Sequence, residues 1–197
     1  MHILVATDIH GTDDTLRRQL ALLGSPVSIV SPWPGDGRPF ATEQQAVQAF
    51  HRDDGLAAFE RSIAAAAGDA PCFYIGFSVG AAALWRHVAG TRCHPGSRAF
   101  LYYGSRIRDA RHLLPRCPTT LYFAAHEPSF EPAVLARELA ASGADCHVLD
   151  GTHHGFMNAA SPHFRPDIAD AHLSMLRRCM DSQRQALASG PGAGSPR

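Results

Sequence analysis

The sequence contains no lysine, so all 18 of its basic residues are arginine. This absence excludes Schiff-base chemistry, attachment of pyridoxal phosphate and a phosphate-binding loop that depends on lysine. The 18 Asp and Glu residues balance the arginines, and the formal net charge is zero. Nucleic-acid binders and proteins that bind anionic membranes normally need a basic surplus, so we expect neither kind of partner.

Long apolar runs and paired cysteines are also missing. No stretch approaches the roughly 20 apolar residues needed to span a bilayer. The segment from Met1 to Asp8 has no basic leader, and its apolar run is too short for a secretory signal. The five cysteines are an odd number, widely spaced and without a C-x-x-C pair. We therefore expect reduced thiols and a cytoplasmic protein.

What the chain does contain is an ordinary globular composition, with 45% hydrophobic and 18% charged residues in a length of 197. Strand-like and helix-like segments alternate, which predicts an α/β domain over residues 1–185 with a mostly parallel sheet and helices on both faces. Residues 186–197 are expected to form a flexible Gly-, Pro- and Ser-rich tail. The expected strands are 2–7, 26–31, 72–75, 98–104, 119–125 and 146–150, and the clearest expected helices are 12–24, capped by Thr12, 44–50, 56–67, 132–143 and 167–185.

The most informative motif is Gly-Phe-Ser-Val-Gly at 76–80, between a predicted strand and an apolar, alanine-rich stretch. A nucleophilic serine on a tight strand-to-helix turn needs small neighbours two residues away on each side, because strand and helix approach closely there. Gly76 and Gly80 meet this requirement around Ser78. The motif alone is weak evidence in a chain with 17 glycines, and a Gly-rich turn with a passive serine is the alternative.

A serine nucleophile requires a base and an orienting acid from later strand ends. Glu127 follows the strand 119–125, and His153 and His154 follow the strand 146–150, which gives the order serine, acid, histidine. Asp150 is a rival acid, but it belongs to the same strand end as the histidines. Glu127 is alternatively a charge at the start of the next helix, and His154 a plain loop histidine.

Histidines at several predicted strand ends raise the alternative of a metal site. Its ligands would be His10, His126, His153 and His154. Their spacing lacks a dense ligand pattern such as H-E-x-x-H, so we expect no metal and no cofactor.

Four short motifs resemble the dienelactone hydrolase family of α/β-hydrolases. They are DIHG at 8–11, GFSVGAAALW at 76–85, YYGS at 102–105 and HHGFMN at 153–158, and the likeness covers about residues 2–180. The resemblance implies a single-domain α/β-hydrolase fold and a triad of Ser78, Glu127 and His154. It also implies an oxyanion hole made by the backbone N–H groups of Ile9 and Val79.

The chain departs from the family pattern at several positions. The named members use cysteine where this chain has Ser78, and their acid is usually aspartate, whereas Glu127 is one methylene longer. A family glutamate that contacts the resting nucleophile aligns with Asp8, and an arginine that pairs with the dienelactone carboxylate aligns with the neutral Asn158. We expect Asp8, His10 and Asn158 to face the substrate, and we expect a neutral or differently placed ester.

Two hypotheses for the function follow. In the first, the protein is a serine hydrolase that cleaves a small carboxylic ester or lactone through an acyl-enzyme, with the small-molecule substrate as its partner. Residues 105–118 are too few to form a cap domain between two strands, which predicts an open site. In the second, the fold is retained in a small-molecule binding or scaffold protein with little turnover.

Overall fold

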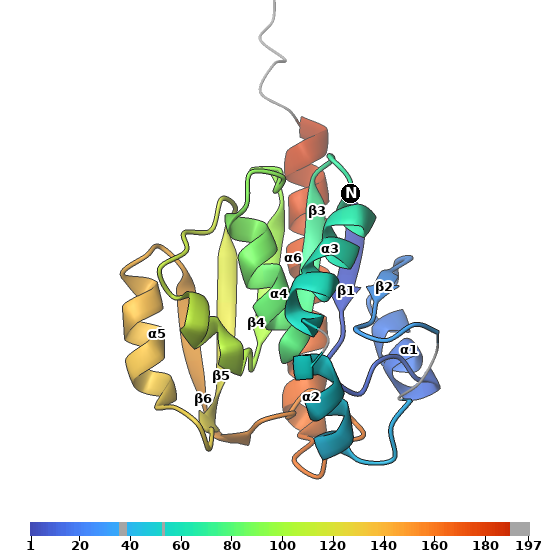
Figure 1. The fold of residues 1–197 in the computed structure, drawn as a ribbon. Helices are drawn as coiled ribbons and strands as arrows, with labels where there is room; N and C mark the ends of the chain where they lie inside the picture. Colours follow the sequence, from blue (N-terminus) through green and yellow to red (C-terminus); the bar gives the residue numbers. More distant parts are fainter. Residues whose placement is uncertain (36–38, 53, 190–197) are drawn as a thin grey trace, which may run out of the picture.

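Six parallel strands form one sheet in the order β2-β1-β3-β4-β5-β6 (Figure 1). The structure is a computed structural model that describes residues 1–35, 39–52 and 54–189. The chain moves from β1 to β2 on one side and then back to β3 on the other side of β1. This switch makes the loops after β1 and β3 diverge, which is where sheets of this type build their sites. The strands are β1 (His2–Ala6), β2 (Ser28–Val30), β3 (Cys72–Phe77), β4 (Arg98–Tyr102), β5 (Thr119–His126) and β6 (Asp145–His153).

Helices cover both faces of the sheet, as predicted. One apolar cluster includes side chains of α2, α3, α4 and α5, and the other includes side chains of α1 and α6. In Figure 1, α6 crosses behind the strands while α3 and α4 lie in front of them. The helices are α1 (Asp14–Ala21), α2 (Glu43–Arg52), α3 (Gly55–Ala67), α4 (Val79–Ala89), α5 (Pro132–Ala140) and α6 (Pro166–Ser189), and a 3-10 helix, η1, spans Ser105–Ala110.

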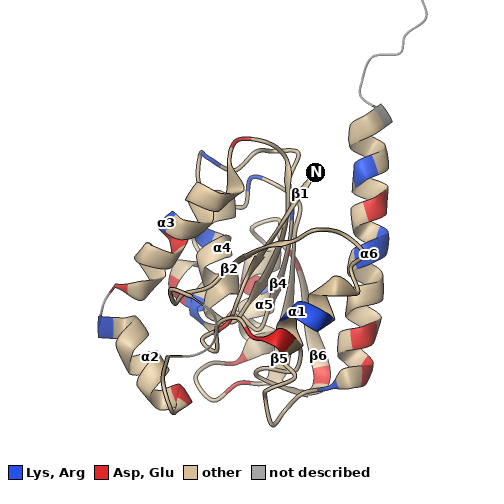
Figure 2. Cartoon of the chain, turned by 90° about the vertical axis from the view of Figure 1, so that its right-hand side faces the viewer, with Lys and Arg blue, Asp and Glu red and all other residues tan. Residues whose placement is uncertain are grey.

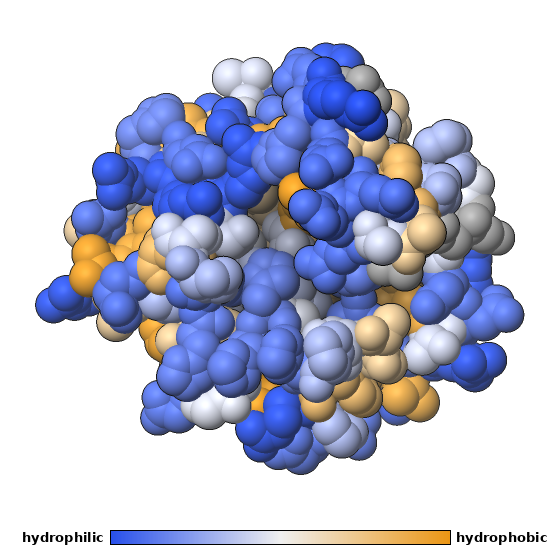
Figure 3. Space-filling view, turned by 60° about the horizontal axis from the view of Figure 1, so that its bottom comes forward, coloured by the Kyte–Doolittle hydropathy of each residue, from blue (hydrophilic) through white to orange (hydrophobic). Residues whose placement is uncertain are grey.

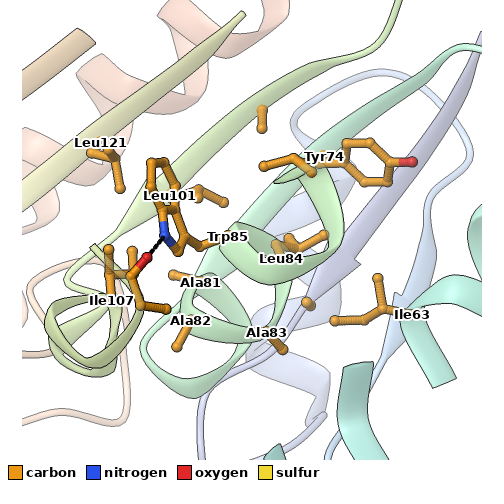
Figure 4. Close-up of a cluster of buried hydrophobic side chains, with 14 of the residues drawn as sticks. Ile63, Tyr74, Ala81, Ala82, Ala83, Leu84, Trp85, Leu101, Ile107 and Leu121 are labelled. Atoms are coloured by element: carbon orange, nitrogen blue, oxygen red, sulfur yellow. Dashed lines mark hydrogen bonds between the residues drawn. The ribbon is translucent and has the colours of Figure 1, made fainter. Parts of the chain in front are cut away.

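Small residues let α4 lie directly against the sheet. Ala81, Ala82 and Ala83 are each 2% exposed or less, and they belong to the same apolar cluster as the fully buried Trp85 (Figure 4). The indole nitrogen of Trp85 donates a hydrogen bond to the carbonyl of Ala110, with 2.9 Å between nitrogen and oxygen. This contact ties η1 to α4. The connection from β4 to β5 is short, and this contact anchors it to α4. Among the described residues, η1 is the one regular element of that connection.

Several boundaries differ from the sequence prediction. Strands β2 and β4 and helices α1 and α5 are shorter than expected, and β3 continues to Phe77. Asp13, and not Thr12, caps α1, because its carboxylate accepts the N–H of Leu16 at 2.7 Å. Strand β6 runs three residues past Asp150, to His153. Helix α6 continues to Ser189, so residues 186–189 of the predicted tail are helical, and residues 190–197 lie outside the described residues.

Charged residues of both signs are interspersed over the surface elements, as Figure 2 shows along α6. The tightly packed strands β3 and β4 are almost entirely buried. Among the described residues, none of the helices combines the length and apolarity required for crossing a bilayer.

Candidate active site

Ser78 is the single residue between β3 and α4. Its backbone has φ 51° and ψ −114°, a conformation that residues other than glycine rarely adopt. The glycines on either side have steric reasons. A Cβ at Gly76 would lie 2.8 Å from Cα of Ala81, and a Cβ at Gly80 would clash with the main-chain oxygens at the end of β1. The sequence motif therefore forms the predicted tight turn.

The structure brings Ser78, His154 and Glu127 into contact from the ends of three different strands. Oγ of Ser78 lies 2.9 Å from Nε2 of His154. Nδ1 of the same ring lies 2.9 Å and 3.2 Å from the two carboxylate oxygens of Glu127. The Glu127 side chain is 2% exposed and that of His154 is 34% exposed. An imidazole with a buried carboxylate on one nitrogen and a serine hydroxyl on the other has the arrangement needed to accept the serine proton.

An irregularity between β5 and β6 sets the position of His154. Three residues of β6, 150–152, lie opposite Ala125 alone. Within this bulge the hydroxyl of Thr152 donates to the carbonyl of Leu149 at 2.6 Å and accepts the N–H of Ala125 at 3.2 Å. Thr152 is fully buried and links the two strands that carry the acid and the histidine.

A cleft of about 640 Å³ opens over these residues, at the edge where the strands end. Figure 3 shows this edge of the molecule, with a hollow near its centre that is bordered largely by hydrophilic side chains. Ile9, Val79, Ser78 and His154 all line the cleft.

Hydrogen bonds fix the directions of the two N–H groups expected to form the oxyanion hole. The carbonyl of Ser78 accepts the N–H of Ala82 within α4, and the trans peptide therefore directs the N–H of Val79 out of the helix start. The carbonyl of Asp8 accepts the N–H of Gly11 at 3.1 Å and the hydroxyl of Thr7 at 3.2 Å. The N–H of Ile9 consequently points away from those two donors.

The structure places Asp8, His10 and Asn158 at the cleft, but two of them bind each other. Nδ2 of Asn158 donates to Oδ2 of Asp8 at 2.6 Å, and the N–H of His10 donates to Oδ1 at 2.9 Å. Asp8 is 8% exposed, and burial raises the pKa of its carboxyl. The ring of His10 lies 3.6 Å from the carboxylate of Glu43 at the rim. Asp8 is thus a buried, internally bonded group.

The proposed alternatives to the triad do not assemble. Asp150 is exposed within β6, and the carboxylate that contacts His154 belongs to Glu127. His153 stacks between the rings of His126 and His163, at centroid separations of 4.7 Å and 4.6 Å. Across the described ranges, His, Cys, Asp and Glu side chains do not form a group of three or more suited to a metal ion.

Sequence reasoning missed two arginines in the cleft. Arg106 and Arg108 extend from η1, and both approach the carboxylate of Asp109, at 3.2 Å and 3.8 Å. A second nitrogen of Arg108 donates to the carbonyl of Ser105 at 2.7 Å. No motif marks these residues, since their relevance depends on where η1 lies relative to Ser78.

Burial decides the roles of two other residue types. Burial raises the pKa of Cys72 to about 12, which leaves its thiol protonated and unsuited to replace Ser78. Three large aromatic residues near the site, Trp85, Tyr103 and Phe156, are core residues, 1% exposed or less. Trp33 donates its indole N–H to the carbonyl of Ile9 at 2.8 Å.

Comparison with known proteins supports the architecture. No protein-family model matches the chain. The uncharacterized protein YczH of Bacillus subtilis is 35% identical over 125 residues, which are 59% of this chain and 57% of that protein, so the match spans little more than half of the relative.

Solved structures with similar folds cover most of the chain. One is the dienelactone hydrolase-like promiscuous phosphotriesterase P91 from metagenomic libraries, with TM-score 0.62, 14% identity and coverage of 92% of this chain and 86% of that one. Another, of the α/β hydrolase superfamily, is from Xanthomonas campestris, with TM-score 0.56, 15% identity and coverage of 94% and 98%. The carboxylesterase CesB of Bacillus subtilis has TM-score 0.54, 11% identity and coverage of 88% and 82%. These likenesses show an α/β-hydrolase fold.

Proposed function

We propose that this protein of α/β-hydrolase fold is a serine hydrolase that cleaves a small carboxylic ester or lactone through an acyl-enzyme intermediate. The observation that carries the proposal is the chain of contacts from Ser78 Oγ to His154 Nε2 and from His154 Nδ1 to Glu127, each 2.9 Å long. The strained backbone of Ser78 supports it, because strain of this kind is typical of a nucleophile on a strand-to-helix turn.

In the first half of the reaction, Oγ of Ser78 attacks the carbonyl carbon while its proton passes to Nε2 of His154. The carbonyl π electrons move to the oxygen, and the N–H groups of Ile9 and Val79 stabilise that negative charge. Donors of this kind commonly contribute about 3 kcal/mol each. The intermediate collapses as the ester C–O bond breaks, and the leaving alkoxide takes the proton from His154.

In the second half, a water molecule loses a proton to the same nitrogen of His154 and attacks the acyl carbon. The bond to Ser78 breaks, and the proton returns to the serine oxygen, so the free acid and the resting enzyme are regenerated. Throughout, Glu127 holds the Nδ1–H tautomer and stabilises the imidazolium.

The shape of the site favours small substrates. Residues 105–118 contain only η1 and short connections within the described chain, so the cleft is open at its rim. The similar fold of the carboxylesterase CesB supports this proposal.

Turnover of p-nitrophenyl acetate tests the proposal. Ser78→Ala is expected to lower kcat by about a million-fold, as for other serine nucleophiles. Ser105→Ala is the matched control, since Ser105 lines the same cleft without contacting His154. Equal rates for the parent and Ser78→Ala would support the alternative of a binding or scaffold protein.

The assignment of the base has its own test. A fluorophosphonate is expected to label Ser78 in the parent and in His153→Ala, and to fail in His154→Ala. Labelling that survives in His154→Ala but disappears in His153→Ala would show that the wrong histidine was chosen.

A further inference from the structure

The contact between Asp8 and Asn158 joins two loops that lie 150 residues apart in the sequence. Asp8 lies in the loop after β1, which also carries Ile9, and Asn158 ends the turn that follows His154. Their side chains meet at 2.6 Å beside the cleft, and Asp8 is nearly fully buried there. This hydrogen bond directly connects the loop that carries the expected oxyanion donor with the loop that carries the expected base.

The hydrogen bonds of Asp8 determine the conformation of the first loop. One carboxylate oxygen accepts the N–H of His10, and the main-chain oxygen accepts the N–H of Gly11. The next carbonyl, that of Ile9, is fixed by the indole of Trp33. The direction of the Ile9 N–H therefore depends on the position of Asp8.

The hydrogen bonds of Asn158 determine the conformation of the second loop. Its N–H donates to the carbonyl of Gly155, directly after His154, and its side-chain oxygen accepts the N–H of Ala160 at 2.8 Å. Because the amide oxygen is engaged, the NH₂ group must face Asp8. The pair thus has a defined donor on one loop and a defined acceptor on the other.

We propose that the Asp8–Asn158 hydrogen bond is a positioning contact that holds the Ile9 loop in register with the His154 loop, so that the oxyanion donor and the base act on the same carbonyl. Both residues are then positioning residues and do not bind the substrate. The inference rests on the proposed function. The amide also favours the ionised form of Asp8, opposing the pKa increase caused by burial.

An exchange of the two side chains tests the contact. Asp8→Asn places two NH₂ groups opposite each other, since the His10 and Ala160 N–H groups keep both amide oxygens engaged. Asn158→Asp places two carboxylates opposite each other. In the double variant Asp8→Asn/Asn158→Asp, donor and acceptor are complementary again, and both backbone N–H groups keep an acceptor.

We expect each single variant to lower kcat for p-nitrophenyl acetate by about 10- to 100-fold, with KM nearly unchanged, because a small displacement of a catalytic group has effects of this size. The double variant is expected to recover to within about threefold of the parent. Asp13→Asn is the matched control in the same region: an asparagine also caps a helix, so its kcat should equal that of the parent. A double variant as slow as the single variants, or single variants as fast as the parent, would overturn the inference.

A second measurement does not require activity. Asn158 is the only asparagine of the chain, so selective ¹⁵N labelling of asparagine reports one side-chain NH₂ group, seen as a pair of cross-peaks in the ¹H–¹⁵N spectrum. Asp8→Ala, which adds no second asparagine, is expected to shift this pair, and Asp13→Ser, which keeps a helix-capping side chain, is expected to leave it in place. A pair that does not move in Asp8→Ala contradicts the contact itself. A parent that shows the shift but no Ser78-dependent turnover contradicts the proposed function and with it the catalytic role of the contact, while the contact stands.

Discussion

At the scale of single residues, the triad candidates could be identified from the sequence because each is tied to a local signal. Ser78 lies in a glycine-flanked turn, and Glu127 and His154 follow predicted strands. The parallel sheet brings all such strand ends to one edge, so their proximity follows from topology. The pairing of Asp8 with Asn158 follows from no rule of this kind. It depends on the path of two loops, and we had expected both side chains to face the substrate.

The buried carboxylate of Glu127 gives the first residue-scale prediction. Glu127→Gln keeps the shape of the side chain but favours the wrong tautomer of His154, so kcat for p-nitrophenyl acetate is expected to fall by about 10⁴-fold. Circular dichroism should confirm that the fold is retained.

Glu43→Gln is the control for that substitution, because Glu43 lies at the rim of the same cleft and its carboxylate is exposed. A Glu127→Gln variant as active as this control would show that the acid has no part in turnover.

At the scale of secondary structure, the order and type of the elements follow from hydrophobic patterning, and the errors lie at their ends. The bulge at 150–152 interrupts the alternation of β6, which is why the strand was predicted to stop at Asp150. Thr12 and Asp13 are adjacent candidates for the same helix cap, and only the geometry distinguishes them. The position of η1, and therefore that of the two cleft arginines, is set by its tertiary contact with Trp85.

The close packing of α4 on β1 predicts a large effect for Gly80→Ala. The added methyl group would clash with main-chain oxygens of Ala6 and Thr7, which cannot move without breaking the sheet. We expect a loss of about 3 kcal/mol in the free energy of unfolding, measured by urea denaturation.

Gly143→Ala is a suitable comparison, since its surroundings are open and only its positive φ of 89° is unfavourable. That variant should lose about 1 kcal/mol. Equal losses for the two variants would mean that α4 does not need the close approach.

The arginines of η1 predict a preference for negatively charged esters. Arg106 and Arg108 both lie within ion-pair distance of Asp109. Among the described residues, no other carboxylate lies within that distance of either guanidinium, so one positive charge is not neutralised. We expect kcat/KM for 4-acetoxybenzoate to exceed that for the neutral 4-acetoxybenzamide by about tenfold, the effect of one charge-assisted hydrogen bond.

Arg108→Gln should remove this preference, whereas Arg111→Gln should retain it, because Arg111 pairs with Glu138 at 3.0 Å and does not line the cleft. Added salt should reduce the difference in the parent. A preference that is insensitive to Arg108 would exclude this role for η1.

At the scale of the whole molecule, the predicted class of fold is confirmed: one α/β domain with a parallel sheet covered on both faces. The sequence is sufficient here because every strand is either a short apolar run or an alternating one between helical segments. The shape of the cleft was not predictable in the same way, since it depends on loops whose relative positions no periodicity encodes.

Stability of the whole domain is expected to decrease in acid because of buried histidine. His87 is 4% exposed, contacts the hydroxyl of Tyr74 at 3.1 Å, and burial lowers its pKa. The folded form therefore resists protonation, whereas the unfolded chain takes up a proton near pH 6.5. The contribution of His87 is complete above about pH 6.5 and decreases as the pH falls toward its folded pKa, by up to about 1.4 kcal/mol per pH unit.

The free energy of unfolding should be measured from pH 7.5 to 5 for the parent, His87→Gln and the exposed control His112→Gln. His87→Gln should flatten the acid slope, and His112→Gln should not. Identical slopes for all three proteins would assign the acid sensitivity to other groups.

The hydrogen bonds of the candidate site also bear on when it forms during protein synthesis. The serine–histidine contact spans 76 positions and the contact between the two loops spans 150. A chain still attached to the ribosome cannot close either contact until His154 and Asn158 have left the exit tunnel, by which time all six strands have been synthesised. Any activity that depends on Ser78 should therefore be absent from nascent fragments that end before Asn158.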